Sequence, residues 1–248
     1  MSDSESVRTK KLYIDGAWQE GGETIAVSDL ATDGTAGRIA AASQHQADDA
    51  LAAAAAAQPA MAETTAVERA QWLETIADAV EDRAEVFTDM IVREAGKPIS
   101  SARGAPAAAA ERFRFAAAEA RDLATNHGEY REGATAGHEE WTAIVKPEPM
   151  GTVLCISPYN YPLQTTVLQV APALAAGNTV VLKPSSKTPL TAAILTDVIT
   201  SAVDLPDGAI NFVPGRGSEI GDTLAGDDRI DTIAMTGSSG AGLSRIPI

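Results

Sequence analysis

Residues 151–163 read Gly-Thr-Val-Leu-Cys-Ile-Ser-Pro-Tyr-Asn-Tyr-Pro-Leu, and this stretch decides the fold. The run from Val153 to Ile156 is apolar without alternation, which is typical of a strand buried on both faces of a parallel sheet. Two prolines then hold a turn that carries Asn160 between Tyr159 and Tyr161. An isolated asparagine in a turn is usually structural, so its interpretation depends on the segments around it.

Strand and helix signals alternate after this stretch. Short apolar runs at 179–182, 210–213 and 231–235 are separated by helical segments expected at 163–176, 190–203 and 218–224. Such repetition predicts an α/β fold, with an open parallel sheet, right-handed crossovers and flanking helices. Ligands of these sheets bind at the carboxyl ends of the strands, where the polar turns of this chain fall.

The first half of the chain carries mainly helical signals. Residues 11–19 predict a short strand and turn, with Asp15-Gly16 at the turn. Helices are expected at 46–58, 66–93 and 107–126, and the polar pair Asp82-Arg83 divides the second one. Residues 128–149 predict a projecting β-hairpin. The expected units are therefore a helical part (1–127), the hairpin (128–149) and the strand–helix repeats (150–248).

Charge and cysteine content limit the classes of function. The chain carries 34 acidic and 19 basic residues, a formal net charge of −15, which argues against nucleic acid and anionic membranes as partners. The acidic surface favours adaptation to high salt, with an ordinary acidic cytosolic protein as the alternative. The single cysteine excludes an intrachain disulfide and, with no signal peptide and no run of 18 apolar residues, predicts a cytoplasmic protein.

Two further segments place the Asn160 turn in context. Lys183-Pro-Ser-Ser-Lys-Thr-Pro189 follows the second strand signal, and Met235-Thr-Gly-Ser238 ends the fourth. In this order and spacing, together with residues 13–18 and 94–98, the segments closely resemble the aldehyde dehydrogenase superfamily. The resemblance covers essentially the whole chain and implies a Rossmann-like cofactor domain. Members of the family are longer, so we expect an N-terminal half from which the C-terminal catalytic domain is absent.

The resemblance assigns roles by position. Asn160 matches the asparagine whose amide forms part of the oxyanion hole, and Tyr159 and Tyr161 match positions that line the aldehyde tunnel. The implied cofactor-binding residues lie on the nicotinamide side (Ile156, Ser157), at the adenosine ribose (Lys183, Ser185, Ser186), beside the adenine (Gly217, Gly221) and at the pyrophosphate (Thr236, Gly237, Ser238, Gly242).

Ser186 departs from the pattern of many NAD-preferring members, which have Glu at this position. A carboxylate there accepts hydrogen bonds from the ribose hydroxyls and repels a 2′-phosphate, whereas Ser186 removes that repulsion. Lys183 and Lys187 supply positive charge nearby. The cofactor is therefore NADP or NAD, with NADP favoured; the alternative is a neutral loop serine with no effect on cofactor choice.

Several expected groups are missing from the sequence. The family's nucleophilic cysteine lies in a Gly-Gln-x-Cys pattern and its general base in Glu-Leu-Gly-Gly, and neither occurs here. Cys155 lies inside a strand and is interpreted as a core residue. Arg112 and Arg114 invite comparison with enzymes that oxidise phosphorylated aldehydes, but exposed helix charges explain them better. No metal site is expected, because His45, His127 and His138 lack ligand spacing.

Two hypotheses for the function follow. The first is an NAD(P)-dependent aldehyde dehydrogenase that acts on a small aldehyde, in which this chain supplies the cofactor site and Asn160. The missing nucleophile and base would then come from a C-terminal half or from a complementing fragment, and full-length relatives are expected to be homo-oligomers. The second is an inactive remnant or cofactor-binding fragment.

Overall fold

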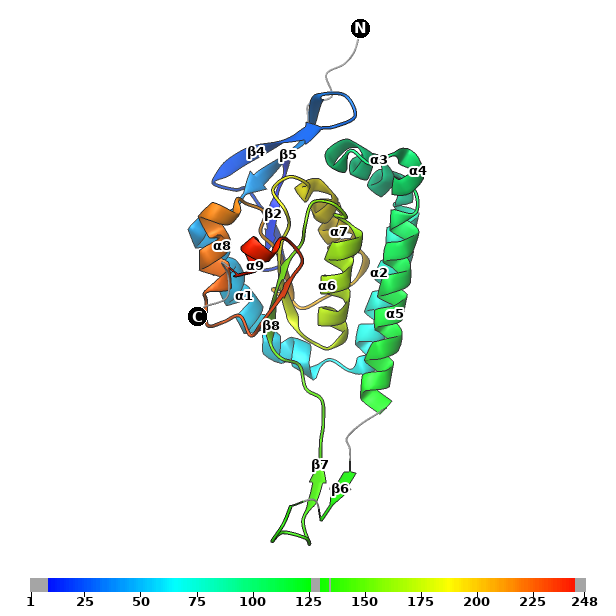
Figure 1. Ribbon diagram of the computed structural model, residues 1–248, viewed down its shortest axis with the longest axis vertical. Helices are drawn as coiled ribbons and strands as arrows, with labels where there is room; N and C mark the ends of the chain where they lie inside the picture. Colours follow the sequence, from blue (N-terminus) through cyan, green and yellow to red (C-terminus); the bar gives the residue numbers. More distant parts are fainter. Residues whose placement is uncertain (1–8, 126–129, 134, 244–248) are drawn as a thin grey trace.

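The computed structural model of the protein describes residues 9–125, 130–133 and 135–243 (Figure 1). A six-stranded sheet lies at its centre, in the order β11-β8-β9-β10-β2-β3. Its first four strands run parallel: β11 (Thr232–Met235), β8 (Thr152–Ile156), β9 (Thr179–Lys183) and β10 (Ile210–Phe212). The predicted α/β class and all four strands of the second half are confirmed.

The other edge of the sheet is antiparallel. Strand β2 (Leu12–Ile14) pairs with β10, with Phe212 opposite Tyr13, and β3 (Ala17–Gln19) pairs with β2. Asp15 and Gly16 join these two strands with φ angles of 50° and 74°, as in a two-residue hairpin turn. The turn was predicted from the sequence, whereas its place at the edge of the central sheet was not, so the sheet is mixed rather than purely parallel.

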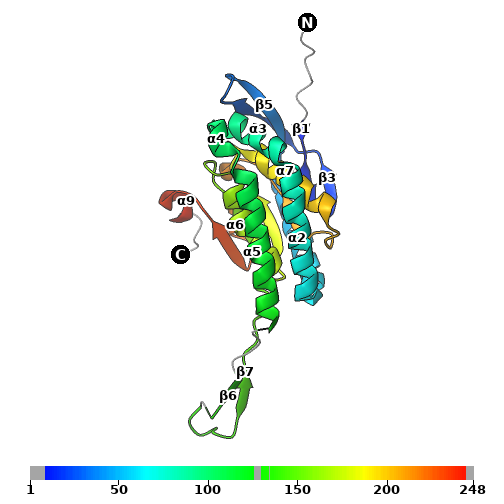
Figure 2. The ribbon, with the colours of Figure 1, turned by 90° about the vertical axis from the view of Figure 1, so that its right-hand side faces the viewer.

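Helices cover both faces of this sheet (Figures 1 and 2). Side chains alternate along β8: Val153 and Cys155 belong to one buried cluster, and Leu154 belongs to the other. Helices α1 (Gln44–Glu63) and α8 (Gly217–Ala225) cover the Leu154 face. The opposite face carries α6 (Gln164–Ala175) and α7 (Pro189–Ala202), with α2 (Ala66–Asp82) and α5 (Ala105–Thr125) packed outside them. Burial on both faces explains the apolar runs of these strands.

The predicted helix ends are largely confirmed. The segment predicted at 66–93 breaks at Arg83, where α2 ends and α3 (Ala84–Ala95) begins, and Gly96 then adopts a φ of 65° that ends α3. Helix α4 (Ile99–Ala102) leads into α5. Helix α1 is longer than the predicted 46–58, because Ser43 and Gln46 form a capping box at its start and the helix continues past Pro59.

A second sheet was not predicted. Strands β1 (Thr9–Lys10), β5 (Gly34–Ala41) and β4 (Glu23–Asp29) form it in that order, with β4 antiparallel to β5. Its sequence mixes small apolar and polar residues and gave no clear strand signal. The sheet lies close to α7, since a side chain at Gly37 would approach Leu190 Cδ1 to 2.7 Å.

The described part of the predicted hairpin, residues 130–133 and 135–149, projects from the body as predicted (Figures 1 and 2). Strands β6 (Tyr130–Glu132) and β7 (Thr142–Ile144) pair antiparallel. Trp141 and Ile144 are 60% and 73% exposed, so the hairpin presents apolar side chains to solvent. Among the described residues no helix combines the length and apolar character that crossing a membrane requires.

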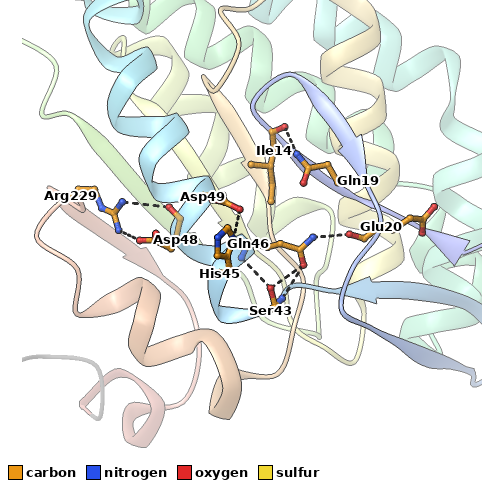
Figure 3. A network of polar contacts seen from close by, with 9 residues as sticks. All are labelled: Ile14, Gln19, Glu20, Ser43, His45, Gln46, Asp48, Asp49 and Arg229. Carbon is orange, nitrogen blue, oxygen red and sulfur yellow. Dashed lines mark hydrogen bonds and ion pairs between the residues drawn. The ribbon is translucent and has the colours of Figure 1, made fainter.

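Polar contacts fasten the start of α1 to the segment before β11 (Figure 3). Arg229 forms ion pairs with Asp48 of α1 and with Asp227, and the pair with Asp227 holds the pKa of that carboxyl at about 2. Gln46 donates a 2.7 Å hydrogen bond to the carbonyl oxygen of Glu20. These contacts connect α1 to segments next to β3 and β11, the two edge strands of the central sheet.

Candidate cofactor and oxyanion site

The carboxyl ends of the parallel strands bring together four of the predicted site residues. Ile156 pairs with Lys183 on one side and with Met235 on the other. The Ser157 N–H donates to the Lys183 carbonyl at 3.3 Å, and the Thr236 N–H donates to the Ile156 carbonyl at 3.1 Å. Ile156, Ser157, Lys183 and Thr236 therefore share one edge of the sheet, the edge at which α/β folds bind ligands.

Gln169 links two of these residues, and sequence reasoning missed it. From α6 its side-chain amide donates to the Ile156 carbonyl at 3.0 Å and to Thr236 Oγ1 at 3.3 Å. The side chain is only 7% exposed. Its one sequence signal is a polar residue in an otherwise apolar stretch of helix.

The turn with Asn160 lies directly beyond β8 and is exposed. Tyr159 and Tyr161 are 55% and 49% exposed, and each ring faces a cation. Lys97 Nζ lies 3.2 Å from the ring centroid of Tyr161, and Lys187 Nζ lies 4.8 Å from that of Tyr159. Partial burial lowers the pKa of Lys97. The lysines thus contact the two side chains that flank Asn160.

The loop after β9 carries the residues predicted to contact the adenosine ribose. Lys183 is 7% exposed, and its Nζ donates to the Gly215 carbonyl at 3.2 Å, so the side chain reaches toward the loop after β10. The Lys187 N–H donates to Ser185 Oγ at 3.2 Å, which shapes the loop as a local turn. Ser185 and Ser186 are half-buried, and residues 183–189 contain no carboxylate.

The predicted glycines fall at two places. Gly217 is the first residue of α8, and Gly221 is buried within the same helix, where packing by itself accounts for a small residue. Gly237 and Ser238 follow β11 and are exposed. The Gly242 N–H donates to the Ser238 carbonyl at 3.0 Å within the single turn of α9 (Ser239–Leu243). Gly217 and Gly221 therefore belong to the helix that follows β10, and Gly237 and Gly242 to the segment that follows β11.

Cys155 is a core residue, as predicted. The side chain is fully buried, and burial raises the pKa of its thiol to about 12. A neutral thiol inside a strand cannot act as a nucleophile, because the thiolate is the reactive form.

The arginines of α5 serve the helix packing. Arg114 forms ion pairs with Asp78 at 2.7 Å and Glu81 at 2.6 Å, both on α2, and Arg112 donates to the Ala108 carbonyl of its own helix. Arg114 is exposed, in agreement with its interpretation as a helix surface charge, whereas Arg112 is half-buried. No cluster of three or more His, Cys, Asp or Glu side chains suited to a metal ion occurs among the described residues, and His127 lies outside them.

A cavity of about 620 Å³ lies at the opposite edge of the sheet. Arg69, Lys146, Pro149 and Ala176 are among its lining residues, and the last two come shortly before β8 and β9. It therefore opens at the amino ends of the parallel strands, away from the predicted site residues.

Comparison with known proteins agrees with this geometry. Residues 18–244 match the model of the aldehyde dehydrogenase family. The chain belongs to the aldehyde dehydrogenase family. It is 36% identical over 234 residues to an NADP-dependent glyceraldehyde-3-phosphate dehydrogenase of Streptococcus equinus, covering 94% of this chain and 48% of that protein. It is 34% identical to an alpha-ketoglutarate semialdehyde dehydrogenase of Haloferax volcanii, with 94% and 47% coverage.

Solved structures of the aldehyde dehydrogenase family superpose closely. The NADP complex of the NADP-dependent glyceraldehyde-3-phosphate dehydrogenase of Bacillus halodurans matches with a TM-score of 0.91 at 36% identity, over 96% of this chain and 50% of that one. The chain thus spans about half the length of the curated relatives it matches.

Proposed function

We propose that this chain is the cofactor-binding half of an NAD(P)-dependent aldehyde dehydrogenase and that it binds NADP in preference to NAD. The observation that carries the proposal is the convergence of Ile156, Ser157, Lys183 and Thr236 at one edge of the parallel sheet. The relatives named above include two enzymes described as NADP-dependent, one of them solved with NADP bound.

The residues present fit a dinucleotide with a 2′-phosphate. Lys183 brings a buried ammonium group toward the loop after β10, and the loop of Ser185 and Ser186 offers hydroxyl donors without a carboxylate. Beyond β11, Gly237 has no side chain to obstruct a pyrophosphate, and the Ser238 hydroxyl is an additional donor. Gly217 and Gly221 would lie on the adenine side.

The bound nicotinamide would supply the hydride acceptor, and this chain would prepare the aldehyde for its reaction. The Asn160 amide would donate to the developing oxyanion, a contact that contributes on the order of 3 kcal/mol to the barrier in such sites. Tyr159 and Tyr161 would form one wall of the aldehyde tunnel. Their rings already contact Lys187 and Lys97.

The nucleophile and the general base must come from outside these residues. Cys155 is the single cysteine of the sequence and is buried in the core. We propose that a C-terminal half, or a separate complementing polypeptide, provides both groups, and that the hairpin of 128–149 serves oligomerisation. The division into 1–127, 128–149 and 150–248 belongs to this proposal. The second candidate is an inactive, cofactor-binding remnant.

Binding and turnover distinguish these possibilities. Calorimetric titration of the purified chain should show NADP binding more tightly than NAD, and assays with a panel of aldehydes should show no oxidation. Aldehyde oxidation by the chain alone would contradict the proposal that the nucleophile and the general base come from elsewhere. Failure to bind either dinucleotide would contradict the cofactor site. Activity restored by adding the C-terminal half of a relative would favour a split enzyme over a remnant.

A further inference from the structure

A buried carboxylate outside the predicted site holds the start of α7. Glu94, in the last turn of α3, is 2% exposed. Its Oε2 accepts the Leu190 N–H and its Oε1 accepts the Thr191 N–H, both at 2.8 Å. A carboxylate that accepts two backbone N–H groups at a helix start satisfies donors that have no partner within the helix and interacts favourably with the helix dipole.

This cap replaces one that the helix would normally supply itself. Thr188 occupies the N-cap position of α7, a position that threonine favours, but its side chain makes no capping hydrogen bond. The Thr188 hydroxyl instead donates to the Tyr159 carbonyl at 3.4 Å. Because Glu94 caps the helix, the Thr188 hydroxyl is available to bond the Tyr159 carbonyl. This bond connects the loop after β9 to the Asn160 turn.

The same short segment contacts the Asn160 turn a second time. Lys97 lies three residues after Glu94 and places its ammonium group over the Tyr161 ring. Gly96, between them, has a φ of 65°, which allows the chain to leave α3 and reach the turn. Segment 94–97 therefore makes two contacts. It contacts the start of α7, directly after the loop 183–188, and it contacts the Tyr161 ring next to Asn160.

We propose that Glu94 is a positioning residue that fixes the ribose loop (183–188) and the Asn160 turn relative to each other. The proposal rests on the cofactor site proposed above, because it concerns how the loop of that site is held. Glu94 itself contacts neither cofactor nor aldehyde; it acts through α7 and Thr188. The expected consequence of its loss is weaker binding of the adenosine half of the dinucleotide in a chain that remains folded.

The test compares Glu94→Gln with the wild-type chain and with Ile91→Ala. Glutamine offers one acceptor oxygen, so one of the two N–H groups loses its partner. Ile91 is buried on the same helix, 1% exposed, and has no part in the cap, so Ile91→Ala controls for loss of stability. All titrations are made well below the melting temperature of each variant.

Glu94→Gln should weaken binding of NADP and of 2′-AMP by the same factor, about tenfold for one lost capping hydrogen bond, and leave nicotinamide mononucleotide unaffected. Ile91→Ala should lower the melting temperature without changing any of the three affinities. Equal affinities in Glu94→Gln and wild type, or equal losses in both variants, would overturn the proposal.

Hydrogen exchange tests the same inference without a ligand. In Glu94→Gln, the amides of 185–188, of Leu190 and Thr191, and of the turn 159–161 should exchange about tenfold faster than in wild type, and in Ile91→Ala they should not. If wild type binds no dinucleotide, the cofactor proposal fails while this exchange pattern still decides on Glu94. Unchanged exchange in both segments of Glu94→Gln would refute the positioning role.

Discussion

The buried carboxyl group of Glu94 links the stability of the fold to pH. Burial raises the pKa of this carboxyl from 4.5 to about 7, although the hydrogen bonds it accepts from the Leu190 and Thr191 N–H groups act to lower that pKa. The folded chain then binds this proton more tightly than the unfolded chain, so the stabilising contribution is fully present below pH 4.5. It is lost as pH rises toward 7, on the order of 3 kcal/mol in total.

Glu94→Gln should remove this dependence, because glutamine does not titrate. Urea unfolding at pH 5 and pH 8 should show the wild-type chain losing free energy of unfolding relative to the variant as the pH rises. A constant difference between the two proteins across this range would show that Glu94 does not titrate there.

The proposed preference for NADP rests on Ser186. Ser186→Glu places a carboxylate where the 2′-phosphate would lie, and like charges in contact are strongly unfavourable. NADP should therefore bind more weakly by about tenfold or more, while NAD changes little or gains affinity. Parallel titrations measure this, with Ser186→Gln as the uncharged control of similar size. Equal losses for both dinucleotides would mean that the side chain disturbs the loop rather than the phosphate.

Helix α2 offers a prediction at the scale of one element. Thr65 and Glu68 form its capping box, with Thr65 Oγ1 accepting the Glu68 N–H at 3.2 Å. Thr65→Ala should reduce the free energy of unfolding by about 1 kcal/mol. Thr75→Ala on the same helix is the matched control, since its exposed hydroxyl only bonds back to the Gln71 carbonyl and its loss should cost little. Similar losses in chemical denaturation of both variants would argue against the cap.

At the scale of elements, local pattern was sufficient where burial is complete. The strands around Val153 and Val181 are apolar on both faces, so their sequence predicted a parallel sheet with helices on both faces. The β4–β5 pair mixes polar residues with small apolar ones and is partly exposed, so no local pattern in its sequence encodes its pairing. The hairpin turn at Asp15-Gly16 could be predicted, but its partner β10 lies almost two hundred residues away.

The candidate site divides in the same way. Asn160, Lys183 and Thr236 could be selected in advance because each follows a strand signal within a recognisable motif. The roles of Gln169 and Glu94 could not be predicted, although Glu94 begins the segment 94–98, because each acts through contacts with distant segments. Gln169 bridges two strand ends, and Glu94 caps a helix 96 residues further on. Long-range hydrogen bonds of this kind leave no periodicity in the sequence.

At the scale of the whole molecule, the net charge affects stability. A formal net charge of −15 produces self-repulsion that dissolved ions screen, which is the basis for expecting adaptation to high salt. Raising KCl from about 0.2 to about 2 M should increase the melting temperature by about 5 °C. Thermal scans in chloride salts test this, because sulfate would also strengthen apolar burial. An unchanged or falling melting temperature would favour an ordinary acidic protein.

Calorimetric titration of the purified 248-residue chain and its Lys183→Ala variant with NADP tests the cofactor site most directly. We predict one NADP bound per wild-type chain, more tightly than NAD, and binding at least about tenfold weaker without the Lys183 ammonium group. An absence of binding to the wild-type chain, or equal affinity in the variant, would contradict a cofactor site at the carboxyl ends of these strands.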